Sequence, residues 1–251
     1  ERVEAWGDDF ILSIFRNKPG WLLSVYPEND IIYQKISSFI NTDTDNILLT
    51  SGIDGGIKTI FEVMTSPGDV VGVLSPTYAM YKVYSNLYQT KLEEIHYEQD
   101  NSLDLDKLIS FIEKRPSILF LPNPNQPIED SLCIDKLSFI AEQCQKNNCL
   151  LFVDEAYHHF GADSSIPLIN NYKNVVVART FSKAFGVPSI RLGFLVSNKS
   201  NMSVISKLRF AHESNTLSNS VAEYLIDNFH IVQEYIDSVI ETRNKLKIIL
   251  K

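Results

Sequence analysis

The chain has 251 residues, of which 44% are hydrophobic and 22% are charged, and its formal net charge at pH 7 is −8. This composition is typical of a globular protein with enough chain for a substantial core. The acidic balance disfavours a nucleic-acid partner, because phosphate polymers require a basic face. No apolar run approaches the roughly 20 residues of a membrane-spanning helix, so we expect no membrane partner.

Short β-rich runs alternate along the chain with longer stretches of helical period. The predicted strands are 46–50, 69–75, 91–97, 117–122, 149–157, 174–180 and 191–197. From about residue 200 onward the pattern is helical, and it closes with an amphipathic stretch at 230–250. Strands without strict alternation that are joined by helices predict a three-layer α/β/α fold around a mostly parallel sheet.

The cysteines and the beginning of the chain favour a cytoplasmic protein. Cys133, Cys144 and Cys149 are odd in number and lack metal-ligand spacing, which indicates reduced thiols and no metal site. The opening "ERVEAWGDDF" lacks the basic and apolar leader that is typical of a signal peptide.

Polar clusters follow five of the predicted strands. They are "SGIDGG", "SPTY", "PNPNQP", "DEAY" and "SK". Ligands of parallel α/β sheets bind outside the carboxyl ends of the strands. The five clusters therefore predict one cleft.

Two of these clusters suit an anion. The glycine-rich loop from Gly52 to Gly56 precedes a helix, so its free N–H groups could hold a phosphate, although taken alone such a loop is more often a simple glycine turn. Ser182 and Arg191 could complete such a site, whereas each alone is more often a capping or surface group.

Asp154 ends a run that should be buried, where a carboxylate needs a cation or hydrogen-bond donors. A helix cap or a structural ion pair would satisfy it as well. Tyr157 could reach the same ligand or merely pack, and Tyr78 and Tyr81 could be core aromatics.

Lysines are mostly exposed, but Lys183 lies just past the strand that follows Asp154. An anion site, an aspartate for a ring cation, an aromatic plate and a reactive lysine together predict a pocket for pyridoxal 5'-phosphate (PLP).

"DEAY" and "SKAFG…RLG", at this separation, resemble the motifs of fold-type I PLP-dependent aminotransferases. Within them the chain is similar to the group of histidinol-phosphate aminotransferase and threonine-phosphate decarboxylase, from about Tyr26 onward. The resemblance implies an aspartate-aminotransferase-like fold with a PLP-binding large domain at 26–220, after an N-terminal segment at 1–25. It also implies that 221–251 begin a long linker helix to a C-terminal small domain that this chain does not include.

The resemblance assigns roles to residues that match the family motifs. Lys183 would form the Schiff base with the cofactor, Asp154 would pair with the pyridine nitrogen, and Tyr157 would bind the phenolic oxygen. Tyr78 would stack on the ring. The phosphate contacts would come from Gly52, Ile53, Asp54, Ser182 and Arg191.

Tyr26 matches a tyrosine that reaches the phosphate of the neighbouring subunit, which implies a homodimer with shared active sites. The family's "NPNNPTG" stands here as "NPNQPIE", so Gln126 takes the place of the expected asparagine, and Asn125 is the second candidate donor. The arginine that binds the substrate carboxylate usually lies in the small domain, and nothing in this sequence replaces it.

These features predict a PLP-dependent aminotransferase that moves an amino group between a small amine or amino acid, phosphorylated ones included, and a keto acid. The alternatives are a PLP-dependent decarboxylase of a phosphorylated amino acid and a truncated, non-catalytic PLP-binding domain. We further expect these 251 residues, made alone, to bind PLP weakly with little or no transamination. The reason is that the far half of the last helix, with Leu246, Ile249 and Leu250, would be exposed.

Overall fold

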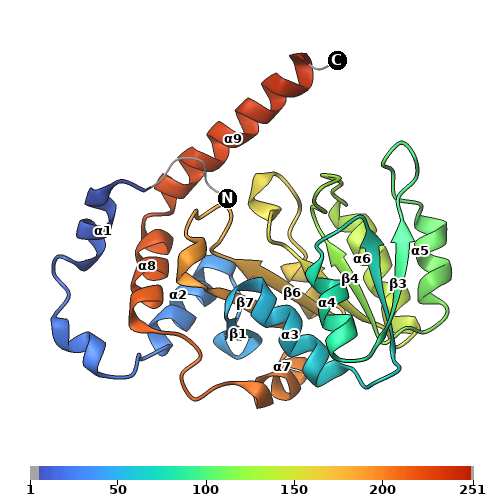
Figure 1. Cartoon of the computed structure of the whole chain (residues 1–251), viewed down its shortest axis with the longest axis horizontal. Coiled ribbons are helices and arrows are strands. Elements are labelled where there is room, and N and C mark those ends of the chain that lie inside the picture. Colours follow the sequence, from blue (N-terminus) through green and yellow to red (C-terminus); the bar gives the residue numbers. More distant parts are fainter. Residues whose placement is uncertain (1–5, 250–251) are drawn as a thin grey trace.

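The computed structural model describes residues 6–249, which form one seven-stranded sheet with helices on both faces (Figure 1). The sheet order is β1-β7-β6-β5-β4-β2-β3, and all its strand pairs are parallel except those made by β7. The strands are β1 (Ile47–Thr50), β2 (Val70–Ser75), β3 (Lys91–His96), β4 (Ile118–Pro122), β5 (Leu150–Asp154), β6 (Val175–Thr180) and β7 (Gly193–Ser197). The predicted mostly parallel sheet is confirmed.

The central strands are buried on both faces because helices cover both. Every residue of β4, β5 and β6 is buried, which explains why these strands read as continuous apolar runs. Helices α3 (Gly52–Met64), α4 (Met80–Leu87) and α7 (Lys199–Ile205) pack on one face. The other face is covered by α2 (Asp30–Ile40), α5 (Leu105–Ile112), α6 (Ile134–Lys146) and α8 (Thr216–Asp227).

The predicted helical region after residue 200 is divided into separate helices. Residues 209–215 are irregular, and α8 then begins behind Asn215, whose side chain accepts a hydrogen bond from the Ser218 N–H. A second break at Asn228 separates α8 from α9 (Phe229–Ile249). The predicted division between residues 220 and 221 falls within α8, where Val221 and Leu225 pack into the main core, and the domain limits stay a prediction.

The N-terminal segment is also attached to this core. Helix α1 (Asp8–Phe15) places Ile14, which is 5% exposed, among the core residues, and the Phe10 ring lies edge-on to Tyr224 of α8 at 5.8 Å. Residues 1–5 of the predicted segment 1–25, and Leu250 and Lys251 of the predicted linker, lie outside the described residues.

Helix α9 is buried only near its beginning. Val232 and Ile236 are in the core, whereas Ile248 and Ile249 are more than three-quarters exposed. Figure 1 shows the far half of α9 extending away from the sheet. None of the helices within residues 6–249 combines the length and the apolar character needed to cross a membrane.

The direction of the strands brings five loops to one edge of the sheet. Strand β1 is antiparallel to β7, which is antiparallel to β6, so β1 runs in the same direction as the other strands. The carboxyl ends of β1, β2, β4, β5 and β6 thus meet at the same edge, and the predicted polar clusters follow all five.

Candidate active site

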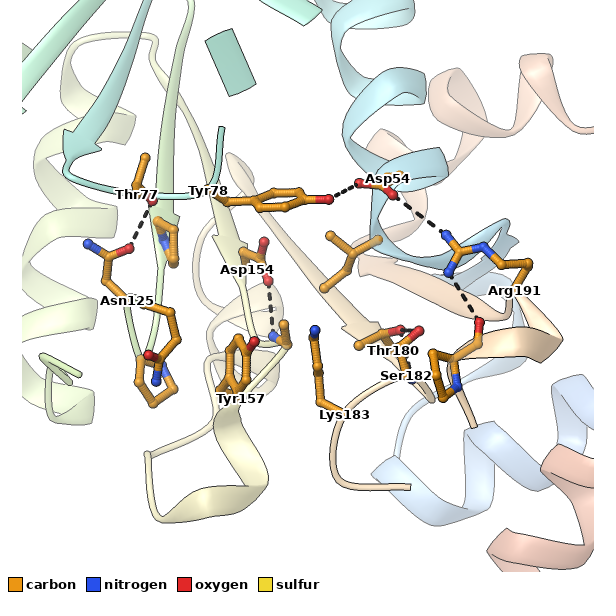
Figure 2. Close-up of a pocket in the computed structure, with 16 residues that line it drawn as sticks. Asp54, Thr77, Tyr78, Asn125, Asp154, Tyr157, Thr180, Ser182, Lys183 and Arg191 are labelled. Atoms are coloured by element: carbon orange, nitrogen blue, oxygen red, sulfur yellow. Dashed lines mark hydrogen bonds and ion pairs between the residues drawn. The ribbon is translucent and has the colours of Figure 1, made fainter. Parts of the chain in front are cut away.

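A cavity of about 290 Å³ lies at this edge of the sheet (Figure 2). Its lining comes from the loops after all five strands, as the shared strand direction requires. Ten of the predicted site residues line it: Ile53, Asp54, Tyr78, Asn125, Gln126, Asp154, Tyr157, Ser182, Lys183 and Arg191.

One end of the cavity is formed by the beginning of α3. The first N–H groups of a helix have no acceptor within it, and here they belong to Gly52, Ile53 and Asp54. Gly52 has a φ of +67°, and a Cβ atom on it would lie 2.9 Å from Nη2 of Arg191. Glycine is therefore needed for the turn and for the approach of the guanidinium to the helix N-terminus.

The Thr180–Ser182 turn supplies a hydroxyl to the same end. The Ser182 N–H donates to the Thr180 hydroxyl oxygen at 3.1 Å. The Thr180 hydroxyl in turn donates to Oγ of Ser182 at 3.0 Å. The Ser182 hydroxyl proton is thus left to donate to a ligand. Sequence analysis did not single out Thr180.

Arg191 is held across from this turn. Its Nη1 donates to the Pro188 carbonyl at 3.2 Å, and its Nη2 lies 3.5 Å from Oδ2 of Asp54. Its backbone is left-handed, with a φ of +51°, which for a non-glycine residue is a strained conformation. Together with the helix N-terminus and Ser182, this side chain makes the end of the cavity suited to an anion.

Asp154 lies at the end of β5 and is 4% exposed. Its Oδ2 accepts from the Tyr81 hydroxyl at 2.7 Å, and its Oδ1 accepts from the Ala156 N–H at 3.0 Å. Burial raises the pKa of this carboxyl to about 6, against the lowering effect of these two hydrogen bonds, and the negative charges of Asp54 and Glu155 add to the rise. A buried carboxylate that borders a cavity would be stabilised by a cationic ligand group.

Lys183 follows β6 and extends into the cavity. Figure 2 shows its amine pointing into the space between Tyr157 and the Thr180–Ser182 turn. The amine nitrogen lies 5.3 Å from the centre of the Tyr157 ring. Among the described residues no hydrogen bond or ion pair engages this amine, so it is available to a ligand.

Tyr78 lies across the cavity from Lys183 in Figure 2. Its hydroxyl donates to Oδ1 of Asp54 at 2.8 Å, and its ring is edge-on to Tyr81, with centroids 6.2 Å apart. Partial burial, together with the hydrogen bond to Asp54, raises the pKa of this phenol above its ordinary range. The hydrogen bond at the hydroxyl therefore holds the ring in place, and a flat ligand can stack on its face.

The two predicted donors of "NPNQPIE", Asn125 and Gln126, differ in their hydrogen bonds. The Asn125 carbonyl accepts from Thr77, and its NH₂ group donates to the Pro76 carbonyl and the Tyr97 hydroxyl at 3.0 and 3.1 Å. Asn125 thus holds the loop together. The Gln126 side chain lines the cavity without a hydrogen-bond partner among the described residues, which makes it the freer donor.

Two predicted site residues do not line the cavity. Gly52 is the first residue of α3 and immediately precedes Ile53, which does line the cavity. Tyr26 is 75% exposed, and its ring stacks on His212 with centroids 4.0 Å apart.

A buried ion pair next to the site was not predicted from the sequence. Glu155 is 1% exposed, and its Oε2 accepts from Nε of Arg179 at 2.9 Å, while its other oxygen accepts from the Ser165 N–H. It links the end of β5, which carries Asp154, to the end of β6, which leads to Lys183. The available signal was a pair of opposite charges at the ends of two apolar strands.

Solved structures show which fold this is. Histidinol-phosphate aminotransferase from Sinorhizobium meliloti, crystallised with PLP, has a TM-score of 0.86 at 22% identity, covering 94% of this chain and 65% of its own. L-threonine-O-3-phosphate decarboxylase from Porphyromonas gingivalis has a TM-score of 0.74 at 21% identity, covering 90% and 70%. A Thermus thermophilus aspartate aminotransferase double mutant has a TM-score of 0.85 at 17% identity, covering 96% and 67%. The fold is aspartate-aminotransferase-like.

Sequence comparison identifies the family. Residues 25–248 match the family model described as Aminotransferase class I and II. Histidinol-phosphate aminotransferase from Clostridium novyi is 31% identical, over 88% of this chain and 62% of its own length. Dihydroxyacetone phosphate transaminase from Campylobacter jejuni is also 31% identical, over 86% and 60%. The chain belongs to the class I and II aminotransferase family and spans about three-fifths of the length of these two relatives.

Proposed function

We propose that this chain is a PLP-dependent aminotransferase that moves an amino group between a small amine or amino acid, phosphorylated ones included, and a keto acid. The observation that carries the proposal is the free amine of Lys183 in the same cavity as the buried Asp154 carboxylate and an anion-binding end. Relatives named for the transamination of phosphate-bearing compounds support the substrate class.

The residues present fit PLP. The first N–H groups of α3, Ser182 and Arg191 would hold its phosphate, and Asp154 would face its ring nitrogen. Tyr78 would cover the ring, while Tyr157 and Gln126 would donate to its phenolic oxygen. Bound PLP supplies an electron sink that stabilises negative charge on the substrate carbon that bears the amine.

Two side chains would do the chemical work. Asp154 would keep the ring nitrogen protonated, and the resulting positive charge would lower the pKa of this carboxyl from its value of about 6 in the cofactor-free protein. Lys183 would hold the cofactor through its amine, which condenses with an aldehyde by releasing water. When free, the same amine would take a proton from the substrate carbon that bears the amino group and later return it.

The proposed assembly is a homodimer with shared active sites, in the cytoplasm. An exposed cluster of apolar side chains supports it: Trp21, Leu23, Val25, Tyr26 and Phe210 are each more than half exposed. The stacking of Tyr26 on His212 brings the two segments of this cluster together. On a neighbouring subunit, Tyr26 would face the phosphate end of the cavity.

The proposed cytoplasmic location is supported by the cysteines: Cys133, Cys144 and Cys149 are all free thiols, as in a reducing compartment.

A single-turnover assay tests this proposal. The protein, with PLP in excess over protein, is mixed with histidinol phosphate or glutamate. Two products are measured: the amine form of the cofactor and the keto product of the substrate. We expect both products in equal amounts, and reversal by a keto acid. Release of carbon dioxide from phosphothreonine without any amine form of the cofactor would instead establish the decarboxylase. Because these 251 residues alone are expected to give little of either product, the contradicting result is the absence of both products from a chain that also spans the remaining length of its relatives.

A further inference from the structure

We propose that Tyr81 is a positioning residue for the reaction: its hydroxyl fixes the orientation of the Asp154 carboxylate and keeps it ionised. This inference rests on the proposed function for its consequence in catalysis, but the contact itself belongs to the cofactor-free protein. The sequence pattern around Tyr81 suits a core aromatic, and this residue does not line the cavity.

The contact is short and completely buried. The Tyr81 hydroxyl donates to Oδ2 of Asp154 at 2.7 Å, and Tyr81 has no exposed surface. Burial, and next the negative charge of Asp154, raise the pKa of this phenol well above its ordinary value, so it stays a donor at any working pH. Its hydrogen bond to an ionised oxygen is of the charge-assisted kind, which is stronger than a neutral one.

The Tyr81 ring cannot easily move, because it is part of an aromatic stack in the core. Its centroid lies 5.1 Å from that of Phe120, which stacks on Phe61 at 4.9 Å and also contacts Phe152 at 5.2 Å. The hydroxyl is therefore presented from a rigid position.

The two donors leave room for a ligand. Oδ1 accepts from the Ala156 N–H and Oδ2 from Tyr81, so each oxygen keeps a lone pair with which to accept from a ring N–H. The same segment also carries Tyr78, three residues earlier, edge-on to Tyr81. One turn of chain therefore sets both the plate above the ring site and the carboxylate at its edge.

The other charged groups around Asp154 do not replace Tyr81. Asp54 and Glu155 act on the carboxyl through negative charge, which opposes ionisation. Lys183 and Arg191 also line the cavity, but neither contacts Asp154 through an ion pair among the described residues. The two hydrogen bonds are what favours the charged form, and Tyr81 provides the only one from a side chain within residues 6–249.

The test is Tyr81→Phe, which removes the hydroxyl and keeps the ring. In the cofactor-free protein the titration of Asp154 is followed by NMR of isotope-labelled aspartate carboxyls, and the resonance is assigned with Asp154→Asn. We expect the pKa of Asp154 to be higher in Tyr81→Phe than in the wild type. Tyr88→Phe, which loses a surface hydrogen bond to Glu62, is the matched control and should leave the titration unchanged.

A second readout uses PLP. The affinity for PLP at pH 7 should fall about tenfold in Tyr81→Phe, and the pH dependence of the absorbance of the bound cofactor should move, as loss of one charge-assisted hydrogen bond predicts. An unchanged Asp154 titration would overturn the inference, whatever happens to PLP binding. If the titration moves but the wild type takes up no PLP, the proposed function fails and the role of Tyr81 in holding Asp154 stands. A loss of stability without a change in titration would mean that Tyr81 only packs.

Discussion

Replacing Asp154 by asparagine should stabilise the cofactor-free protein, and more so as the pH rises. The carboxyl is buried, with a pKa of about 6 in place of the ordinary 3.8. Because the folded-state pKa is the higher one, the folded protein binds more protons than the unfolded chain between these values. Its stability is therefore lost as the pH rises through this range.

The difference between a folded-state pKa of about 6 and the ordinary 3.8 means that Asp154 lowers the free energy of unfolding by about 3 kcal/mol at pH 8. At pH 5 this loss is roughly half as large. An asparagine would remove this cost and keep both neighbours in contact, although the Tyr81 hydroxyl proton would lose its Oδ2 acceptor. Its carbonyl can accept from the Ala156 N–H, and its NH₂ group can donate to the Tyr81 oxygen.

The assay is urea unfolding without PLP, followed by circular dichroism between pH 5 and pH 8. We expect Asp154→Asn to be more stable than the wild type by about 3 kcal/mol at pH 8, with a smaller difference at pH 5. Asp43→Asn is the control, because it removes an exposed carboxylate that pairs with Lys199. The stability of this variant should depend on pH as that of the wild type does. A difference that does not change with pH, or a less stable variant at pH 8, would refute the reasoning. In saturating PLP the order should reverse if Asp154 pairs with the ring nitrogen.

Three further substitutions test the surroundings of the site. Glu155→Gln should destabilise the protein by about 3–5 kcal/mol in urea unfolding, because it leaves Arg179 buried without its counter-charge. Arg191→Ala should weaken the binding of both PLP and inorganic phosphate at least about tenfold by equilibrium dialysis, because one charged partner of the anion is lost. Gly193→Ala should lower the melting temperature markedly, because its Cβ atom would lie 2.7 Å from the Arg179 carbonyl oxygen.

Each of these has a matched control and a contrary outcome. Glu142→Gln, in a surface pair with Lys146, should change stability by less than about 1 kcal/mol, and an equal loss in Glu155→Gln and Glu142→Gln would mean that burial does not matter. Unaltered phosphate binding in Arg191→Ala would move the anion site elsewhere. Gly20→Ala, whose Cβ atom would meet no atom within 4 Å, should be tolerated. An unchanged melting temperature in Gly193→Ala would contradict the steric argument.

The sheet and the position of the cavity were predictable because both follow from local patterns. Continuous apolar runs indicated buried parallel strands, and the shared direction of those strands brings "SGIDGG", "DEAY" and "SK" together. The division of residues 216–249 into two helices was not predicted, because a helical period does not show where one helix ends and the next begins. At this break the backbone N–H and the side-chain NH₂ of Asn228 both donate to the Tyr224 carbonyl, a local cap that the helical period alone does not indicate.

Contacts between distant segments could not be predicted in the same way. Tyr81 meets Asp154 across 73 positions in sequence, and Asn125 uses up its amide on Thr77, Pro76 and Tyr97. A tyrosine in a helix or an asparagine in a loop has the same local sequence pattern whether it packs, holds a loop or faces a ligand. The expected weak PLP binding of the 251-residue chain stays a prediction, which the exposed far half of α9 motivates.

The most direct test of the central claim is the identity of the lysine that binds PLP. The protein is incubated with saturating PLP, reduced with borohydride, digested and mapped by mass spectrometry, with Lys183→Ala as the control. We predict a pyridoxyl phosphate group on the peptide that contains Lys183, and no labelled peptide in the control. Labelling of a different lysine in the wild type, or no labelling at saturating PLP, would contradict the account.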